Sequence, residues 1–277
     1  MIDITTDSCA DLSKELISSR SIRVIPLQVF IENQNLKDGE ISTQELFNRV
    51  EASGSLPKTA APSVAEFARF FETPGETIFI GISSKLSATV PNSLLSLDLI
   101  NPDKNVYILD SLNLSTGIGL LVLKAADLRD QGYSAVEIVE TLRQLTPKVR
   151  TSFIIDTMEY LYKGGRCTAL QAIFGSVLKI RPVIEVREDG TLGVKDKLRG
   201  GRQKGLKSLL DDFISHLDEM DLKRVFITHT GCDQDAAYLA QEIRKSSPVE
   251  EVLITTAGAT ISSHCGPNTI GILYMVK

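Results

Sequence analysis

Hydroxyl side chains gather where short apolar runs end, and these residues are well suited to bind an anion. Ser83 and Ser84 follow an apolar run at 77–82, and the pattern after them predicts a helix over 86–99. A helix N-terminus offers free backbone N–H groups and the positive end of the helix dipole, which favour a negative ligand group. Either Ser83 and Ser84 bind a small anion there, or one of them only caps the helix.

Two further side chains can donate a hydrogen bond to a carboxylate. Thr59 lies between Pro57 and Pro62, which exclude a regular helix and predict a stiff loop. Its hydroxyl either faces a ligand or bonds to the neighbouring backbone. His264 follows a strand predicted at 252–256 and precedes a turn. Its ring is therefore either a donor to a bound carboxylate or a structural histidine.

A nucleophilic enzyme would need a serine or cysteine beside a base. Cys265 follows His264 directly, but neighbours in an extended segment point to opposite faces, which disfavours direct activation. For His216, within a predicted helix, and His229, at a predicted strand end, structural roles are favoured. The chain has no G-x-S-x-G elbow, no Walker A motif and no complete dinucleotide fingerprint. These patterns predict a protein that binds an anionic ligand without performing chemistry on it.

The elements that carry these side chains follow the order of a parallel sheet in the first half of the chain. Three times a β-branched, apolar run ends in hydroxyl or acidic residues and opens into a helical pattern, with strands predicted at 2–5, 77–82 and 106–109. An extended stretch is predicted at 22–31, and a largely buried helix at 117–128. This order predicts an α/β fold with a Rossmann-like parallel sheet, whose loops at the carboxyl ends of the strands bind the ligand.

The pattern changes near residue 150, where we place the boundary between an N-terminal domain, 1–150, and a C-terminal domain, 151–277. Asp189 and Gly190 predict a tight hairpin turn between strands at 183–186 and 192–194. Further strands are predicted at 151–155, 224–228, 252–256 and 269–276, and helices at 206–217 and 236–245. This mixture predicts a C-terminal α+β domain.

The composition is that of a folded protein with a small acidic excess. Of the 277 residues, 43% are hydrophobic, and the formal net charge of −5 gives no field that would gather nucleic acid. The four cysteines are scattered without metal-site spacing, which predicts reduced thiols and no metal. The N-terminus lacks the pattern of a secretory signal, and the apolar runs are shorter than the roughly 20 residues of a membrane helix. We expect a cytoplasmic protein without stable membrane insertion or a cofactor.

Five motifs follow one another along nearly the whole chain. They are T-D-S-x-x-D-L at 6–12, S-S-x-L-S-x-T at 83–89, D-S-x-x-x-S-x-G-x-G at 110–119, E-Y-L-x-K-G-G-R at 159–166 and H-x-G-P-x-x-x-G at 264–271. Together they resemble the DegV family of bacterial fatty-acid-binding proteins.

The resemblance implies two α/β-type domains that enclose one long-chain fatty acid, with its carboxyl group near the domain junction and its acyl tail buried. The family's carboxylate-binding residues fall by position on Thr59, Ser83, Ser84 and His264. Family members of known role are carriers rather than enzymes. A separate ATP-dependent fatty acid kinase phosphorylates the bound acid, and the acyl phosphate feeds phospholipid synthesis. The resemblance therefore implies a fatty acid as ligand and a fatty acid kinase as partner.

One loop departs from the family pattern. It commonly reads K-[TS]-S-Q-P, whereas Ala60 and Ala61 stand here in place of the two polar residues after Thr59. The polar network around the carboxyl group is therefore expected to differ. Burying roughly fifteen methylenes at about 0.8 kcal/mol each would contribute about 10 kcal/mol before ordering costs, so the tail should dominate the affinity. Pocket shape, including the region of Phe174, should select the acyl chain.

Other interpretations remain open beside the carrier. A serine/histidine-dependent lipid hydrolase or acyltransferase would use a hydroxyl activated by His264, and a protein for a smaller anion would have a short polar pocket. A basic stretch either docks an acidic kinase surface or is a solvated charged face. Its members are Arg166, Lys195, Lys197, Arg199, Arg202 and Lys204.

Overall fold

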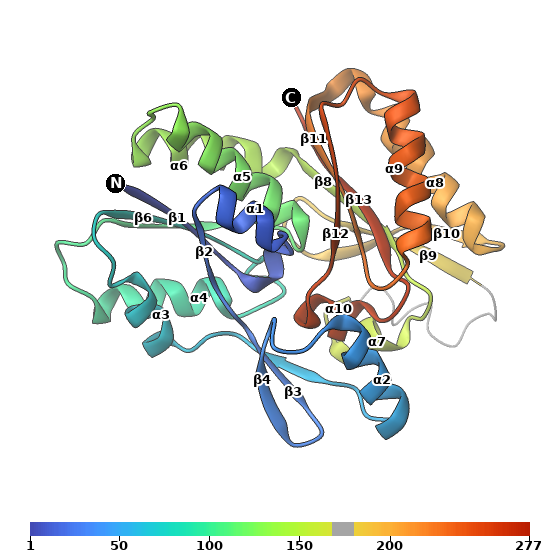
Figure 1. Cartoon of the computed structure of the whole chain (residues 1–277), viewed down its shortest axis with the longest axis horizontal. Helices are drawn as coiled ribbons and strands as arrows, with labels where there is room; N and C mark the ends of the chain where they lie inside the picture. Colours follow the sequence, from blue (N-terminus) through green and yellow to red (C-terminus); the bar gives the residue numbers. More distant parts are fainter. Residues whose placement is uncertain (168–179) are drawn as a thin grey trace.

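The strands form three sheets in the computed structural model, which describes residues 1–167 and 180–277 (Figure 1). The first sheet has four parallel strands in the order β2-β1-β6-β7. Their bounds are β1 Ile2–Asp7, β2 Ile22–Ile25, β6 Glu76–Gly81 and β7 Val106–Asp110. The Rossmann-like parallel sheet expected for the N-terminal half is confirmed.

Helical segments lie between these strands and after β7. They are η1 Ser8–Ala10, α1 Lys14–Ser19, α3 Val64–Phe71, α4 Thr89–Leu95, η2 Ser96–Leu99, α5 Thr116–Asp130, α6 Ala135–Leu145 and η3 Thr146–Lys148. Two of the helices begin with a complete capping box, Ser63 with Glu66 in α3 and Ser134 with Glu137 in α6. In each box the serine side chain and the glutamate side chain satisfy backbone N–H groups at the helix start.

A small antiparallel sheet interrupts the first half of the chain. It has the order β4-β3-β5, with β3 Gln28–Ile31, β4 Gln34–Lys37 and β5 Lys58–Ala60, and helix α2 Thr43–Ser53 lies between the last two strands. The extended stretch predicted at 22–31 is therefore two strands in two sheets, separated at Pro26. Proline lacks the N–H group that a continuous strand would need for pairing.

The second half of the chain forms a six-stranded mixed sheet in the order β10-β9-β8-β13-β11-β12. The strands are β8 Val149–Ile154, β9 Ile180–Val186, β10 Leu192–Arg199, β11 Met220–His229, β12 Glu251–Thr256 and β13 Ile270–Val276. The helical segments are α7 Glu159–Gly164, α8 Arg202–Ser215, η5 Leu217–Glu219, α9 Asp233–Ser246 and α10 Ala259–Cys265. The predicted hairpin is confirmed as β9 and β10, which pair antiparallel.

Helix α5 lies between the two large sheets, whereas α8 and α9 cover the far face of the six-stranded sheet (Figure 1). Helix α5 contacts β1 and β6 on one side and β8, β11 and β13 on the other, which explains why most of its residues are buried. A side chain at Gly119 would press against Leu12 and the carbonyl oxygen of Ala10 at 3.1 Å or less. This glycine therefore permits the close approach of α5 to the first sheet.

One large hydrophobic cluster joins the two halves of the chain. It includes Ile4 and Ile78 from the first sheet, Leu121 from α5, and Phe226 and Leu273 from the six-stranded sheet. Strand β8, the first strand of the six-stranded sheet, begins one residue before the predicted domain boundary at 150. The division into domains 1–150 and 151–277 nevertheless stays a prediction, because the core is continuous across it.

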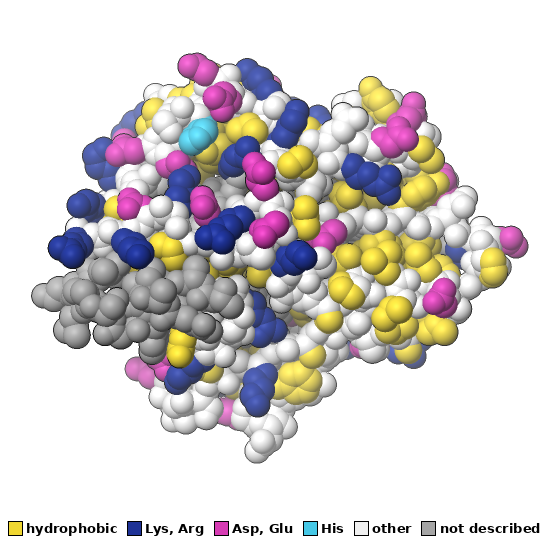
Figure 2. Space-filling view, turned by 180° about the vertical axis from the view of Figure 1, so that it is seen from behind, with side chains coloured by type: hydrophobic (Ala, Val, Ile, Leu, Met, Phe, Trp, Pro, Cys, Tyr) yellow, Lys and Arg dark blue, Asp and Glu magenta, His cyan; other side chains and the backbone are white. Residues whose placement is uncertain are grey.

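The surface of the two halves differs in character. Seen from behind, the half with the six-stranded sheet carries intermixed positive and negative side chains, and hydrophobic side chains gather on the other half (Figure 2). Within the predicted basic stretch, Arg202 pairs with Asp156 at 3.0 Å, and Lys195 pairs with Asp212 at 2.7 Å. These two cations are thus partly neutralised by the protein itself.

Candidate functional site

A cavity of about 270 Å³ lies between the two halves, at the carboxyl ends of the first sheet's strands. Most of its wall is aliphatic, and its rim is formed by exposed residues, Ala60, Ala88 and Arg166. The volume is close to the lower end of the roughly 300–1,000 Å³ typical of ligand pockets. The full lining is Leu27, Thr59, Ala60, Ala61, Ile82, Leu86, Ser87, Ala88, Leu114, Leu161, Arg166, Leu192, Thr260, Ile261, His264 and Cys265.

Two of the four predicted site residues meet in this wall. Thr59 lies on β5, where it pairs with Val29 of β3, and His264 lies on α10. The Thr59 Oγ1 and His264 Nε2 atoms are 2.8 Å apart, within hydrogen-bond distance. The residues are 205 positions apart in the chain, so only the folded structure brings them together. The flanking prolines predict a stiff loop at Thr59, but the structure has the short strand β5 there.

The His264 ring is neutral at physiological pH. Burial, aided by the positive charge of Arg166, lowers its pKa to about 4. The other ring nitrogen, Nδ1, is buried without a partner and faces Gly164, where an added Cβ would come within 2.6 Å of it. Because a buried N–H group rarely goes unpaired, this geometry favours the tautomer with the proton on Nε2. His264 then donates to Thr59, which leaves the hydroxyl proton of Thr59 free for a ligand.

The other two predicted residues, Ser83 and Ser84, do not line the cavity. The predicted helix over 86–99 begins only at Thr89 and its N-cap is Ala88, so Ser83 and Ser84 do not stand at the helix N-terminus and neither of them caps it. Instead Ser83 begins a tight turn, because its carbonyl oxygen accepts from the N–H groups of Leu86 and Ser87. Its hydroxyl donates to the carbonyl oxygen of Gly190 at 2.8 Å. This bond joins the turn to the β9–β10 hairpin.

The Ser84 backbone is held by Asp110, whose two carboxylate oxygens each lie 3.2 Å from the Ser84 N–H nitrogen. The residues that follow Ser84 and Lys85 and line the cavity are Leu86, Ser87 and Ala88. Ser87 belongs to the same S-S-x-L-S-x-T motif and comes four positions after Ser83, so this motif does contribute a hydroxyl side chain to the cavity wall. Phe174, which was expected to shape the pocket, lies outside the described residues.

Two carboxylates from the N-terminal half hold the first turn of α10. Asp11 Oδ1 accepts from the N–H of Gly258 at 2.7 Å, and Asp38 Oδ1 accepts from the N–H of Ala259 at 2.8 Å. Asp11 also accepts from the Ser115 hydroxyl at 2.6 Å. These bonds satisfy backbone donors that a helix start leaves free. The T-D-S-x-x-D-L motif, through Asp11, therefore positions the helix that carries His264.

A smaller chamber of about 30 Å³ adjoins the cavity and shares Leu114, Ile261 and Cys265 with it. Its remaining lining residues come from the N-cap of α5, the strands of the six-stranded sheet and their loops: Ser115, Thr151, Phe153, Thr228, His229, Thr230, Ala257, Thr269, Gly271 and Leu273. The hydroxyls of Ser115, Thr151, Thr228, Thr230 and Thr269 all bond to protein atoms. Few polar groups are thus left for water, so the chamber suits an apolar group.

The comparisons with known proteins agree over the whole chain. The family model described as "Uncharacterised protein, DegV family" matches residues 1–277. The chain belongs to the DegV family. A DegV domain-containing protein of Caldanaerobacter subterraneus subsp. tengcongensis is 32% identical over 281 residues, which span 100% of this chain and 99% of that protein.

Solved structures of DegV proteins share this fold. A DegV family protein from Thermus thermophilus, described by its fatty acid binding, has 31% identity and a TM-score of 0.92 over 100% of this chain and 99% of that one. DegV of Bacillus subtilis, described as a fatty acid binding protein, has 28% identity and a TM-score of 0.88 with the same coverage. The family resemblance of the five motifs is confirmed, and these structural neighbours bind fatty acids.

The chain's departure from the DegV loop pattern falls within the cavity. Ala60 and Ala61, which replace the two polar residues, both belong to the lining. The wall beside Thr59 therefore offers methyl groups where the common pattern has hydrogen-bonding side chains.

Cys265 is unsuited to act as a nucleophile for a reason other than an extended backbone. We predicted an extended segment at Cys265 and His264, but both residues lie in helix α10. Burial raises the pKa of the Cys265 thiol to about 12, with a smaller effect of the Asp11 charge. The reactive thiolate is therefore scarce at neutral pH, and the neutral imidazole of His264 bonds to Thr59 rather than to sulfur.

The two other histidines lie apart from the Thr59–His264 pair. His229 is 3% exposed in the smaller chamber, and its Nδ1 accepts from the Cys232 N–H at 3.2 Å. His216 follows α8 and contacts the Tyr274 ring, with 6.1 Å between ring centroids. Across residues 1–167 and 180–277, no group of three or more His, Cys, Asp or Glu side chains is placed to hold a metal ion. Within the same ranges, no helix combines the length and apolarity needed to cross a bilayer.

Proposed function

We propose that this DegV protein is a carrier that holds one long-chain fatty acid between its two halves. The acid's carboxyl group lies at Thr59 and His264, and its acyl tail fills the apolar cavity and points toward the smaller chamber. The observation that carries this proposal is the hydroxyl–imidazole pair, 2.8 Å apart, in an otherwise largely apolar wall. The fatty acids bound by DegV proteins of similar fold support it.

The two ends of the ligand have different tasks in this proposal. Each buried methylene contributes about 0.8 kcal/mol, so the tail supplies most of the affinity. The carboxylate loses its hydration on binding, and hydrogen bonds from the protein offset that loss. Because His264 is neutral, the pair offers hydrogen bonds rather than a full positive charge. Thr59 and His264 thus determine which end of the acid lies near the rim.

Ser83 and Ser84 stay in the proposal as headgroup ligands, as the family resemblance implies. The Ser83 hydroxyl would have to exchange its bond to Gly190 for one to the ligand, which requires a rearrangement of the turn. Ser83→Ala and Ser84→Ala test this directly. Direct ligation by either serine predicts a weaker affinity for palmitate in the corresponding variant. An unchanged affinity in both would restrict the headgroup site to residues of the cavity wall.

We further propose that the carrier acts in the cytoplasm and presents the acid to a separate ATP-dependent fatty acid kinase. The kinase role rests on the family resemblance, and the position of the Thr59–His264 pair beside the exposed rim residues Ala60 and Arg166 supports it, because a partner must reach the carboxyl group. Thr59→Ala and His264→Ala should keep much of the lipid binding but lose acyl phosphate formation by the kinase. Unchanged phosphorylation in both variants would refute the proposed headgroup roles.

The simplest test is to denature the purified protein, extract it with organic solvent and identify the released molecules by mass spectrometry. About one equivalent of fatty acid is expected. Absence of lipid, together with no uptake of added fatty acid, would contradict the carrier. Hydrolysis of acyl esters by the protein would favour the hydrolase or acyltransferase instead, and binding of a phosphosugar would favour a small-anion protein.

A further inference from the structure

One hydroxyl in the cavity wall has no bonding partner. Thr260 is 3% exposed and lines the main cavity, yet its Oγ1 atom is buried without a hydrogen bond. Leaving a buried polar group unpaired costs roughly 1–3 kcal/mol, so such groups in native proteins call for an explanation. A ligand in the cavity would supply the missing partner.

The other hydroxyls of the same helix are satisfied by the protein. Ser263 donates to the carbonyl oxygen of Ala259 at 2.7 Å, and Ser262 donates to that of Ala257 at 3.2 Å. Thr43 donates to the same Ala257 oxygen at 2.6 Å. Serine and threonine in helices commonly form such bonds to the preceding turn. Thr260 differs from Ser262 and Ser263 in two respects, because it forms no such bond and it lines the cavity.

Thr260 is also placed beside the proposed headgroup site. It precedes His264 by four residues in α10, so the two side chains share one face of the helix, with Cβ atoms roughly 5–6 Å apart. Both line the main cavity, as does Thr59. A carboxylate has two oxygens that accept hydrogen bonds and no proton to donate, which matches hydroxyl donors on either side of it.

The loop that departs from the family pattern lies in the same cavity. Ala60 and Ala61 line the wall without a side-chain donor, and the common pattern has polar residues at these positions. We propose that Thr260 is a further ligand of the bound fatty acid's carboxylate and supplies a donor that this loop lacks. This proposal rests on the proposed carrier function.

The test compares isosteric variants of the delipidated protein. Thr260→Val removes the hydroxyl and keeps the branched shape, and Thr260→Ser keeps the hydroxyl. A hydrogen bond to a charged group predicts an affinity for palmitate about tenfold weaker in the valine variant and within about twofold of the wild type in the serine variant. The affinity for 1-hexadecanol, which carries no charge, should fall much less. Isothermal calorimetry measures each value.

Thr5→Val provides the matched control, because the buried Thr5 hydroxyl donates to the carbonyl oxygen of Ile78 at 3.1 Å and lines neither the cavity nor the smaller chamber. The control should lower the melting temperature of the ligand-free protein and leave palmitate affinity unchanged. Thr260→Val should lower the affinity for palmitate without lowering the melting temperature of the ligand-free protein, since it removes a hydroxyl that has no partner.

Each outcome bears on one proposal. Palmitate affinity within twofold of the wild type in Thr260→Val would overturn the role of Thr260, as would an equal loss for palmitate and hexadecanol. If the valine variant does not fold, Thr260→Ala and Thr260→Ser decide the matter in the same way, with weak binding expected only for alanine. Failure of the wild-type protein to bind palmitate would instead refute the carrier function itself.

Discussion

At the scale of single residues, the site depends on a histidine that acts without a charge. Burial keeps the His264 imidazole neutral, and its bond to Thr59 directs the threonine hydroxyl proton away from the ring. The pair therefore behaves as a chain of hydrogen-bond donors. Such an arrangement can stabilise a carboxylate while costing less desolvation than a buried ion pair would.

The pKa of His264 predicts how its contribution to stability changes with pH. Its folded-state pKa of about 4 lies below the ordinary value of 6.5, so protonation favours the unfolded chain. The contribution is complete above pH 6.5 and is lost as the pH falls toward 4. In the ligand-free protein, the free energy of unfolding should therefore decrease relative to a His264→Gln variant by about 3 kcal/mol across this interval.

Urea unfolding of both proteins between pH 7.5 and 4 measures this difference. Glutamine can still donate to Thr59 but does not titrate, so groups common to both proteins cancel. Asp7 is one such group, because burial raises its pKa to about 6 and its effect has the opposite sign. Parallel pH profiles for the two proteins would show that His264 is not a buried neutral ring.

Residue types identified candidates, but pairing them required the fold. Thr59 and His264 each allowed a structural interpretation when taken alone, and the family motifs were needed to connect them. Thr260 carried no motif at all. Its significance comes from an unpaired hydroxyl in a cavity wall, a property of the packed structure that no spacing in the sequence reports.

At the scale of elements, the smaller chamber predicts a limit on acyl chain length. Its volume of about 30 Å³ has room for one or two groups the size of a water molecule or methyl group. Ala257 lines this chamber and is 2% exposed. Ala257→Val adds two carbons there, so we expect the ratio of bound stearate to bound palmitate to fall about tenfold.

Competition between equal amounts of the two acids, followed by extraction and mass spectrometry, measures this ratio. Ala240→Val serves as the control, since Ala240 is buried in the core between the six-stranded sheet and its outer helices, away from both cavities. Overpacking alone should leave its ratio at the wild-type value. The same ratio in Ala257→Val and the wild type would show that the tail does not reach this chamber.

The elements were predictable where local signals agreed with the fold. The β9–β10 hairpin follows from Asp189 and Gly190, and three parallel strands follow from their β-branched runs. The start of α4 was not predictable in this way. A tight turn held by the Ser83 carbonyl oxygen takes the place of the first helical turn. The Ser83 hydroxyl donates to the carbonyl oxygen of Gly190, and this bond joins segments 107 residues apart.

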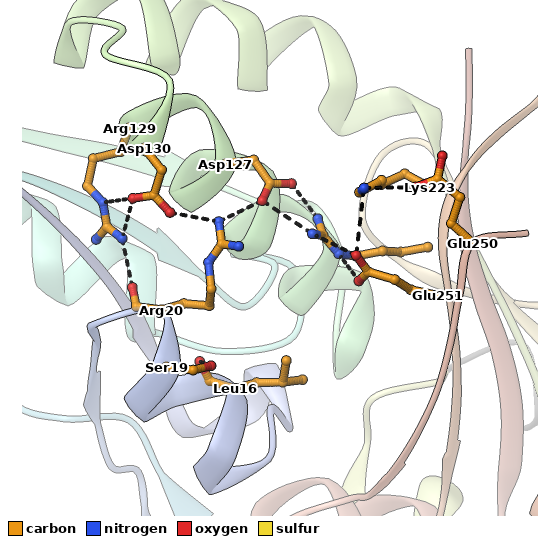
Figure 3. Close-up of polar contacts among 10 residues, drawn as sticks. Leu16, Ser19, Arg20, Asp127, Arg129, Asp130, Lys223, Glu250 and Glu251 are labelled. Atoms are coloured by element: carbon orange, nitrogen blue, oxygen red, sulfur yellow. Dashed lines mark hydrogen bonds and ion pairs between the residues drawn. The ribbon is translucent and has the colours of Figure 1, made fainter.

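At the scale of the whole molecule, a chain of alternating charges joins the two halves. Arg129, Asp130, Arg20 and Asp127 from the N-terminal half lead to Glu251, Lys223 and Glu250 on the other (Figure 3). The link between them is Arg224, which is 8% exposed and pairs with both Asp127 and Glu251. Burial acts to raise the pKa of Asp127, but its bonds to Arg224 and Arg20 outweigh burial and lower that pKa.

Removing the central cation should destabilise the protein. Arg224→Met leaves Asp127 and Glu251 with weaker partners in a half-buried setting, and we expect a loss of about 2–3 kcal/mol in the free energy of unfolding. Lys223→Met is the control, because Lys223 is 47% exposed and should contribute less than about 1 kcal/mol. Denaturant unfolding measures both. Equal losses for the two variants would show that burial does not distinguish these ion pairs.

The overall class of the molecule was accessible from the sequence, but the relation between its halves was not. Alternating strands and helices indicate an α/β fold, and the composition changes near residue 150. The burial of α5 between two sheets makes one core out of both halves, and its sequence shows only that the helix is buried. The cavity lies at this junction, where residues distant in sequence meet.

We propose that a fatty acid binds with its carboxyl group at Thr59 and His264, and the whole account depends on this binding mode. It is tested most directly by nuclear magnetic resonance of delipidated protein loaded with palmitate that carries carbon-13 in its carboxyl group. We predict one bound carboxyl resonance whose titration near pH 5 is suppressed, and whose chemical shift moves in Thr59→Val and in His264→Gln. A resonance that titrates like free palmitate, or that neither variant moves, would contradict the account.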